Sequence, residues 1–220
     1  MRDVGNKKDM PRETRKPTGG PAIPYPVDPM PAEVAALREA AAPVWLFAYG
    51  SLMWNPEFAY AEAAPALLRG YRRRFCLFSY DYRGTPARPG LVLGLDRGGT
   101  CRGIAYRLAP ESLPQSLDRI WAREMAGGVY ELRRLLLRFG GNAVAGYAFA
   151  VRRQHPDYAG QLSLDETARF ILTGAGSRGR CRDYLDSTLA HLEALGLADP
   201  PLRRLAARVH ALAMSEAQGG

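Results

Sequence analysis

A glutamate stands where the helical pattern of residues 110–128 calls for an apolar side chain. Leu113, Leu117 and Ile120 follow an i, i+4, i+7 spacing and therefore share one face of a helix. The next position on that face is Glu124, in the last turn before a Gly-Gly pair. Apolar surroundings and the negative end of the helix dipole both disfavour a carboxylate, so we expect its pKa to be raised. Such a group suits general acid–base catalysis.

The same pattern is compatible with a structural glutamate. Glu124 has Arg123 beside it in the sequence and Arg133 nearby, and either arginine could form an ion pair with it. Its side chain could also reach solvent at the helix end. Perturbed carboxylates are also common in structural ion pairs of this kind. The pattern alone leaves both interpretations open.

A second unusual stretch is VWLFAYGSLMWNP, residues 44–56. Residues 44–49 have the composition of a buried strand, which ends abruptly at Gly50 and Ser51. Backbone N–H groups just past a strand end can bind an anionic or developing oxyanionic group when no bulky side chain covers them. A plain turn has the same composition, so this signal is weak by itself.

The composition is that of a soluble globular protein. The chain has 220 residues, 47% hydrophobic and 24% charged, and no apolar run approaches the roughly 20 residues of a membrane span. No apolar segment follows the basic N-terminus as in a secretory signal, so we predict a cytoplasmic location. Cys76, Cys101 and Cys181 are too far apart for a zinc site, and we expect reduced, buried thiols. The three histidines share no metal-ligand spacing, so we predict no metal.

The net charge of +8 comes mainly from arginine. It is compatible with a nucleic-acid-binding protein, with a solvated basic surface, or with an anionic small substrate. The arginines are spread along the chain and do not interleave with aromatic residues as in an RNA-binding sheet. We therefore expect no nucleic acid partner and no membrane partner.

The chain divides into an N-terminal arm, a domain and a tail. Residues 1–43 are rich in proline and glycine, with a possible short helix over 31–42. The domain spans 44–214 and the tail 215–220.

Residues 44–151 have mostly strand patterns, over 44–49, 71–80, 90–95, 101–108, 131–139 and 143–151. Glycines predict hairpins at 96–99 and 140–142. Helices are predicted over 111–125, 163–173, 181–195 and 201–214. This order predicts an α+β fold with a small curved or closed sheet and helices packed outside it.

Five sequence blocks together resemble the ChaC-like γ-glutamylcyclotransferases, which are glutathione-specific. The blocks occur in the family's order and span most of residues 44–209; they are FAYGSLMW (47–54), RGTPARPGLVLGLD (83–96), CRGIAYRL (101–108), IWAREMAGGVY (120–130) and RDYLDSTLAHLEALGLAD (182–199). The resemblance implies a small mixed β-barrel with flanking helices and C-terminal helices. It also implies an enzyme without metal or other cofactor, which cyclises the γ-glutamyl group of glutathione to 5-oxoproline and releases Cys-Gly.

The resemblance also assigns roles to particular residues. Tyr49, Gly50, Ser51 and Leu52 match the family's substrate-binding loop, and Glu124 matches its catalytic glutamate. Tyr130 matches a tyrosine that the family keeps near the site, so we expect it to bind substrate. Arg88 is a candidate partner for a substrate carboxylate, because an arginine fork suits that group; plain surface charge is the alternative.

One segment departs from the family's pattern. The family usually has an asparagine before the helix that starts near residue 182, whereas this chain has arginines at positions 178, 180 and 182. If this segment meets the glycine end of glutathione, selectivity among γ-glutamyl peptides could change. Two alternatives therefore stay open: a cyclotransferase for other γ-glutamyl peptides or amines, and a non-catalytic basic protein that binds nucleic acid. The sequence predicts no oligomeric state.

Overall fold

The computed structural model describes residues 27–218. Most of the predicted arm, residues 1–26, lies outside the described residues. The short helix predicted in the arm is confirmed as α1 (Ala32–Ala35), which continues into the 3-10 turn η1 (Ala36–Glu39). Pro31 precedes its first residue, a position where the missing N–H group costs nothing.

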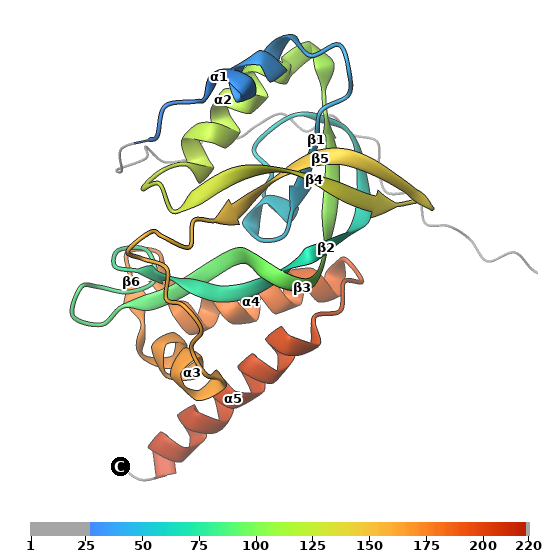
Figure 1. The fold of residues 1–220 in the computed structure, drawn as a ribbon. Helices are drawn as coiled ribbons and strands as arrows, with labels where there is room; N and C mark the ends of the chain where they lie inside the picture. Colours follow the sequence, from blue (N-terminus) through green and yellow to red (C-terminus); the bar gives the residue numbers. More distant parts are fainter. Residues whose placement is uncertain (1–26, 219–220) are drawn as a thin grey trace, which may run out of the picture.

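The centre of the molecule is a closed five-stranded barrel with strand order β1-β3-β2-β4-β5. Its strands are β1 (Trp45–Ala48), β2 (Tyr60–Ser79), β3 (Gly90–Leu108), β4 (Tyr130–Phe139) and β5 (Asn142–Val151). Neighbouring strands are antiparallel except β1 and β5, which pair in parallel at Leu46 and Tyr147. The predicted mixed barrel is therefore confirmed (Figure 1).

The hairpin predicted across residues 96–99 is wrong. The segment is the middle of one continuous strand, β3, which pairs with β2 almost from end to end. Gly98 and Gly99 do have positive φ angles of 96° and 77°, as a hairpin turn would require. They lie opposite Gly70, whose φ is 83°, and the register of the two strands shifts there. The glycines thus form a bulge that bends both strands together and helps the sheet close.

The second predicted hairpin is confirmed. β4 and β5 pair from Tyr130↔Val151 to Phe139↔Asn142, and Gly140 and Gly141 form the turn between them. Both glycines have positive φ, 56° and 80°, which is the backbone that a two-residue hairpin turn requires. Tyr130, the first residue of β4, pairs with Val151 at the end of this hairpin away from the turn.

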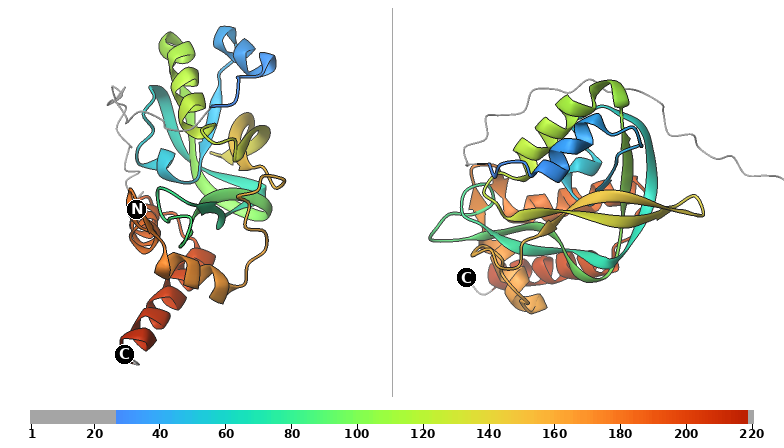
Figure 2. Two further views of the ribbon diagram at one scale, coloured as in Figure 1. Left: turned by 90° about the vertical axis from the view of Figure 1, so that its left-hand side faces the viewer. Right: turned by 45° about the horizontal axis from the view of Figure 1, so that its top comes forward.

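Helices cover two sides of the barrel (Figures 1 and 2). On one side α2 (Leu113–Glu124) follows the turn η3 (Pro110–Ser112) and lies next to α1. On the other side lie α3 (Leu164–Thr173), α4 (Cys181–Ala194) and α5 (Pro200–Gln218). All four predicted helices are confirmed, including the capping box of Ser163 and Glu166 at the start of α3. α5 continues to Gln218, into the segment predicted as a tail.

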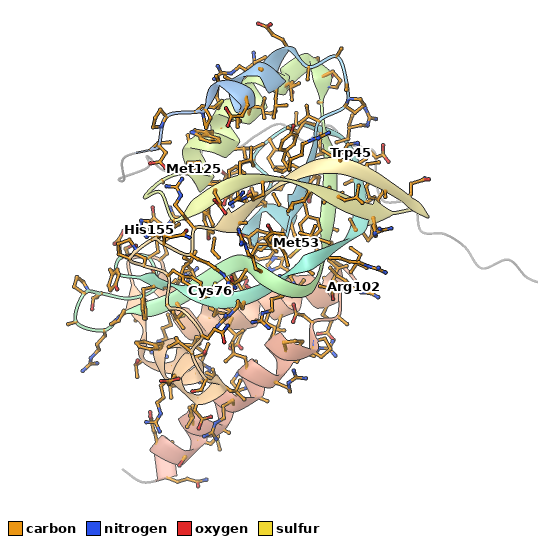
Figure 3. The ribbon with its side chains drawn as sticks, viewed as in Figure 1. Trp45, Met53, Cys76, Arg102, Met125 and His155 are labelled. Atoms are coloured by element: carbon orange, nitrogen blue, oxygen red, sulfur yellow. The ribbon has the colours of Figure 1, made fainter. Side chains whose placement is uncertain are left out.

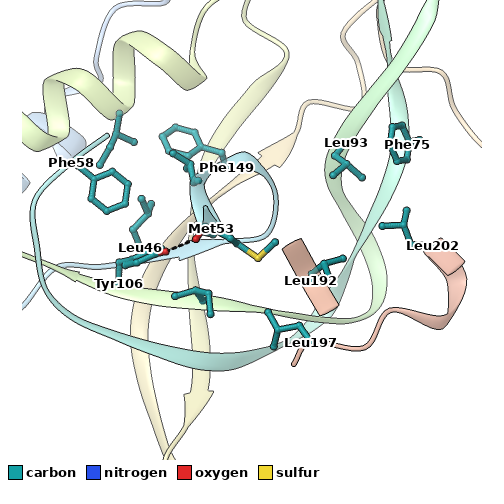
Figure 4. Packing of buried hydrophobic residues seen from close by; sticks show 14 of the residues in the cluster. Leu46, Met53, Phe58, Phe75, Leu93, Tyr106, Phe149, Leu192, Leu197 and Leu202 are labelled. Carbon is teal, nitrogen blue, oxygen red and sulfur yellow. Dashed lines mark hydrogen bonds between the residues drawn. The ribbon is translucent and has the colours of Figure 1, made fainter. Parts of the chain in front are cut away.

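The largest apolar cluster joins the barrel to both sets of helices. Within it Phe75 of β2 and Leu93 of β3 lie toward the C-terminal helices, beside Leu192 and Leu202 (Figure 4). Figure 3 shows side chains filling the space between the sheet and these helices. The Tyr106 hydroxyl in β3 donates to the Met53 carbonyl at 2.9 Å, which fixes the segment after β1 against the barrel wall.

All three cysteines are buried free thiols, as expected. Burial raises the pKa of Cys76 to about 12 and that of Cys181 to about 11, so neither is a ready nucleophile. Within residues 27–218, no helix is long and apolar enough to span a membrane. In the same range, no three His, Cys, Asp or Glu side chains come together as metal ligands would.

Candidate active site

A cavity opens where the chain leaves β1 and α2 ends. The space between its lining atoms, including the part open to solvent, is about 360 Å³. Residues from β1, β3, α2, β4, β5 and α4 contribute to its wall. They are Phe47, Tyr49, Gly50, Ser51, Leu52, Leu93, Glu124, Tyr130, Phe149 and Tyr184. The two unusual features of the sequence, the Gly50-Ser51 stop and the displaced glutamate, thus face one cavity.

The loop after β1 exposes backbone to this cavity. After Tyr49 the chain enters the 3-10 turn η2 (Ser51–Met53), closed by a 2.9 Å hydrogen bond from the Met53 N–H to the Gly50 carbonyl. A methyl group built on Gly50 would meet only Leu93, at 4.0 Å, so no protein atoms crowd this position. Among the described residues, no hydrogen bond uses the N–H of Ser51 or Leu52. Amides at the start of a helical turn lack internal partners and can bind a ligand oxygen.

Glu124 is the last residue of α2 and lies on the same helix face as its buried apolar residues. Leu113, Leu117 and Ile120 are buried in the core as the spacing predicts, and the Glu124 side chain is 15% exposed. Burial raises the pKa of Glu124 above the usual value of 4.5. The positive charge of Arg123 opposes this effect, and the negative charge of Glu57 adds to it. The carboxylate therefore holds a proton more readily than a solvated glutamate.

Glu124 also has the arginine contact that the sequence left open. Arg123 Nε lies 3.2 Å from Glu124 Oε1, whereas Arg133 pairs with Glu131 at 2.7 Å. The guanidinium of Arg123 donates further to the Ser51 hydroxyl at 2.6 Å and to the Asn55 carbonyl at 2.7 Å. The two interpretations are thus not exclusive: Glu124 lines the cavity, and its partner Arg123 also fixes the loop across from it.

Three tyrosines form the rest of the polar wall: Tyr49, Tyr130 and Tyr184. Burial raises the pKa of each phenol above its usual value, and the nearby negative charge of Glu124 adds to the effect. The Tyr130 hydroxyl donates to the Leu93 carbonyl at 2.8 Å. These groups stay protonated at neutral pH, so they supply neutral hydrogen-bonding groups around a single carboxylate.

A buried arginine holds the loop from the opposite side. The Arg73 side chain is 1% exposed, and its Nε donates to the Tyr49 carbonyl, directly before Gly50. Its remaining donors reach Asp199 at 2.6 Å and the Arg102 carbonyl at 2.7 Å. Asp199 also accepts from the Leu202 N–H at 3.0 Å, so one carboxylate both caps α5 and neutralises Arg73. The loop is therefore anchored to the C-terminal helices.

The family assignment follows from comparison with known proteins. The ChaC-like protein family matches residues 44–212. The chain belongs to this family. The resemblance drawn from the five sequence blocks is therefore confirmed.

Named relatives of this ChaC-like chain are cyclotransferases. It is 37% identical over 182 residues to the glutathione-specific gamma-glutamylcyclotransferase of Escherichia coli K12, covering 82% of this chain and 79% of the relative. It is 32% identical over 185 residues to gamma-glutamylcyclotransferase 2-3 of Arabidopsis thaliana, covering 79% of this chain and 92% of the relative.

The fold of the ChaC-like chain is found in a solved structure. The crystal structure of a yeast gamma-glutamyl cyclotransferase specific to glutathione superposes with a TM-score of 0.69 at 22% identity. The superposition covers 77% of this chain and 96% of the yeast chain. At this identity the likeness establishes the shared fold.

Arg88 is the one predicted site residue that the structure does not bring to the cavity. It lies exposed at the tip of the loop between β2 and β3, where it exchanges backbone hydrogen bonds with Thr85. Arg83, earlier in the same loop, lies 5.0 Å above the Tyr184 ring. Its Nη1 donates to the carbonyls of Arg178 and Arg180, at 2.6 and 3.3 Å. The arginine-rich segment 178–182 is therefore hydrogen-bonded to Arg83, which also contacts Tyr184 in the cavity wall.

The sequence analysis missed Arg73 and Tyr184 as parts of this site. Tyr184 lies within a sequence block that carried the family resemblance, and it precedes the buried Leu185 in α4. A polar aromatic next to a buried position was the available signal. Arg73 lies in a run of three arginines, and the available signal was strand alternation, which places Arg73 on the same face as the buried Phe75 and Leu77 and its exposed neighbour Arg72 on the other.

Proposed function

We propose that this chain is a glutathione-specific γ-glutamylcyclotransferase, with Glu124 as its general acid–base. One observation carries the proposal: in a ChaC-like chain, a buried carboxylate and the bare backbone of Gly50–Leu52 line the same cavity. The names of the E. coli and yeast relatives support glutathione as the substrate. The products are 5-oxoproline and Cys-Gly, which together contain all the atoms of glutathione.

The reaction needs one group that first takes a proton and then returns it. Glu124 accepts a proton from the α-ammonium group of the γ-glutamyl residue, and the freed amine attacks the γ-carbonyl carbon. The N–H groups of Ser51 and Leu52 donate to the developing oxyanion. When the amide C–N bond breaks, protonated Glu124 donates to the departing nitrogen. The ring nitrogen then loses its second proton, which passes through Glu124 to the freed amine of Cys-Gly, so Glu124 ends as a carboxylate. Because burial raises the pKa of Glu124 while Arg123 limits the rise, the carboxyl group can perform both steps.

The cavity wall supports this arrangement without a second charged base. Tyr49, Tyr130 and Tyr184 stay protonated, so they can orient the substrate through hydrogen bonds and leave proton transfer to Glu124. We propose Tyr130 as a substrate-binding residue on this basis. Since α4 supplies Tyr184, the C-terminal helices complete a site that the barrel alone would leave open.

A substrate panel tests the proposal and its selectivity. The purified chain is incubated with glutathione, γ-glutamylcysteine, a γ-glutamylamine and glutathione esterified at its glycine carboxylate, and 5-oxoproline is measured. Turnover of glutathione well above the others is expected. Equal turnover of the γ-glutamylamine would instead identify a broader cyclotransferase, and the absence of 5-oxoproline with every substrate would overturn the proposal.

Arg88 remains a proposed partner for a substrate carboxylate. If Arg88 binds that carboxylate from outside the cavity wall, Arg88→Ala should raise KM for glutathione without changing KM for the γ-glutamylamine. Arg83, over the Tyr184 ring, is the alternative arginine on this side of the cavity. The same comparison with Arg83→Ala shows which of the two meets the carboxylate.

A further inference from the structure

The loop after η2 contains a residue in a conformation unusual for its type. Glu57 has a φ of 55°, and among residues 27–218 it is the only non-glycine with positive φ. Glycine or asparagine is the usual residue there, because a larger side chain crowds its own backbone. Strained residues of this kind persist where the surrounding structure holds them, often at functional sites.

Both oxygens of the Glu57 carboxylate are engaged by neighbours. Asn55 Nδ2 donates to Glu57 Oε1 at 2.7 Å, and Arg123 Nη1 lies 3.3 Å from Glu57 Oε2. The same guanidinium contacts Glu124 Oε1 through its Nε at 3.2 Å. One arginine is therefore shared by two carboxylates, one on the loop and one at the end of α2.

We infer that Glu57 is a positioning residue for the proposed reaction: it holds Arg123 between two carboxylates and thereby keeps Glu124 able to take up a proton. The inference rests on the proposed function. If Glu57 were absent, Arg123 would be free to pair with Glu124 alone and would favour its ionised form more strongly. Glu57 also keeps the guanidinium in place to donate to the Ser51 hydroxyl, 2.6 Å away.

The other polar groups around Glu124 are uncharged, so Arg123 and Glu57 are the residues whose charges set its pKa. The phenols facing the carboxylate come from the end of β1, the start of β4 and the first turn of α4: Tyr49, Tyr130 and Tyr184. All three stay neutral at the pH of the reaction, because burial raises their pKa values. Within residues 27–218, the charged groups that shift the pKa of Glu124 are Arg123 on its own helix and Glu57 on the facing loop, and they act with opposite sign.

The pH dependence of kcat/KM for glutathione tests the inference, because its acidic limb reports protonation of the catalytic base in the free enzyme. Glu57→Gln should move this limb to lower pH, and Arg123→Gln should move it to higher pH. At a pH below the limb, kcat/KM of each variant, expressed as a fraction of its own plateau, should differ from that of the wild type by about two- to fivefold, the change expected for loss of a partly buried ion pair. A residue with only a structural role would change the plateau and leave the limb in place.

Two further variants separate this result from misfolding. Glu57→Gly removes the carboxylate and relieves the positive φ, so it should unfold at an equal or higher temperature while moving the limb as Glu57→Gln does. Glu62→Gln is the control, because Glu62 forms a surface ion pair with Arg107 at 3.2 Å, away from the cavity; its limb should match that of the wild type.

The outcomes are distinguishable from failure of the proposed function. A wild type without 5-oxoproline formation overturns the proposed function. An active wild type whose acidic limb stays fixed in Glu57→Gln and Glu57→Gly overturns the inference alone. Limb shifts of the same sign in Glu57→Gln and Arg123→Gln would also overturn it.

Discussion

Replacing Asp199 by alanine tests whether a buried ion pair holds the loop at Gly50. The Asp199 and Arg73 side chains are 13% and 1% exposed, and their charged atoms lie 2.6 Å apart. Removing one partner of a buried pair costs about 3–5 kcal/mol, because the other charge is left without a counterion. Asp199 also caps α5 through the Leu202 N–H, and loss of a cap costs about 1 kcal/mol. Arg73 keeps two backbone acceptors, so the expected loss for Asp199→Ala is about 4 kcal/mol.

Urea and thermal unfolding measure this loss. In a domain of this size each kcal/mol lowers the Tm by about 2–4 °C, so Asp199→Ala should melt roughly 8–16 °C below the wild type. Asp199→Asn keeps the cap and a neutral acceptor, and should lose about half as much. Glu193→Ala is the control, since its contact with Arg203 at 3.7 Å is highly exposed and contributes at most about 1 kcal/mol. A loss below about 1 kcal/mol for Asp199→Ala would refute the assigned role of this pair.

Three further predictions concern single positions. Glu124→Gln should be more stable than the wild type at pH 7, because burial raises the pKa of Glu124 and its ionised form therefore opposes folding. This gain in stability should vanish below pH 4.5, where the glutamate is protonated in both the folded and the unfolded state. Denaturation of both proteins at pH 7 and below pH 4.5 measures it. Asp96 is buried and accepts from Arg153 and Tyr158, which hold its pKa below 3.8 although burial opposes ionisation. The contribution of ionised Asp96 to stability is therefore complete above about pH 3.8 and is lost as the pH falls through the folded-state pKa. Asp96→Asn should lower the free energy of unfolding by about 3 kcal/mol at pH 7. Unfolding measured at decreasing pH should show the stability difference between the variant and the wild type shrink. Gly176→Ala should lower the Tm, because the added Cβ would lie 2.0 Å from a backbone carbonyl, that of Asp81, and overpacking costs about 1–3 kcal/mol.

Short-range periodicity was enough to predict much of the fold. The apolar face of α2, the capping box of α3 and the Gly140-Gly141 turn each depend on residues within a few positions of one another. The segment at Gly98 and Gly99 was misjudged for the same reason. Its positive φ angles fit a turn or a bulge equally well, and only the pairing with distant β2 distinguishes them.

In the candidate site too, local patterns predicted some residues but not the contacts between distant ones. Glu124 was identifiable because it interrupts a 3.6-residue period, and the Gly50 loop because a strand ends there without a polar turn sequence. The supporting arginine contacts were not predictable. Arg73 and Asp199 lie 126 positions apart, and Arg123 meets Ser51 across 72 positions. Such pairs depend on how the barrel closes, which local patterns do not encode.

The most direct measurement is the rate of 5-oxoproline formation from glutathione by the wild type and by Glu124→Gln, both confirmed as folded by their unfolding transitions. We expect the wild type to form 5-oxoproline and Cys-Gly in equal amounts. The variant should be slower by about 10²–10⁴-fold, the usual contribution of a general acid–base. A variant as fast as the wild type would contradict the assignment of Glu124, and a wild type that forms no 5-oxoproline would contradict the function itself.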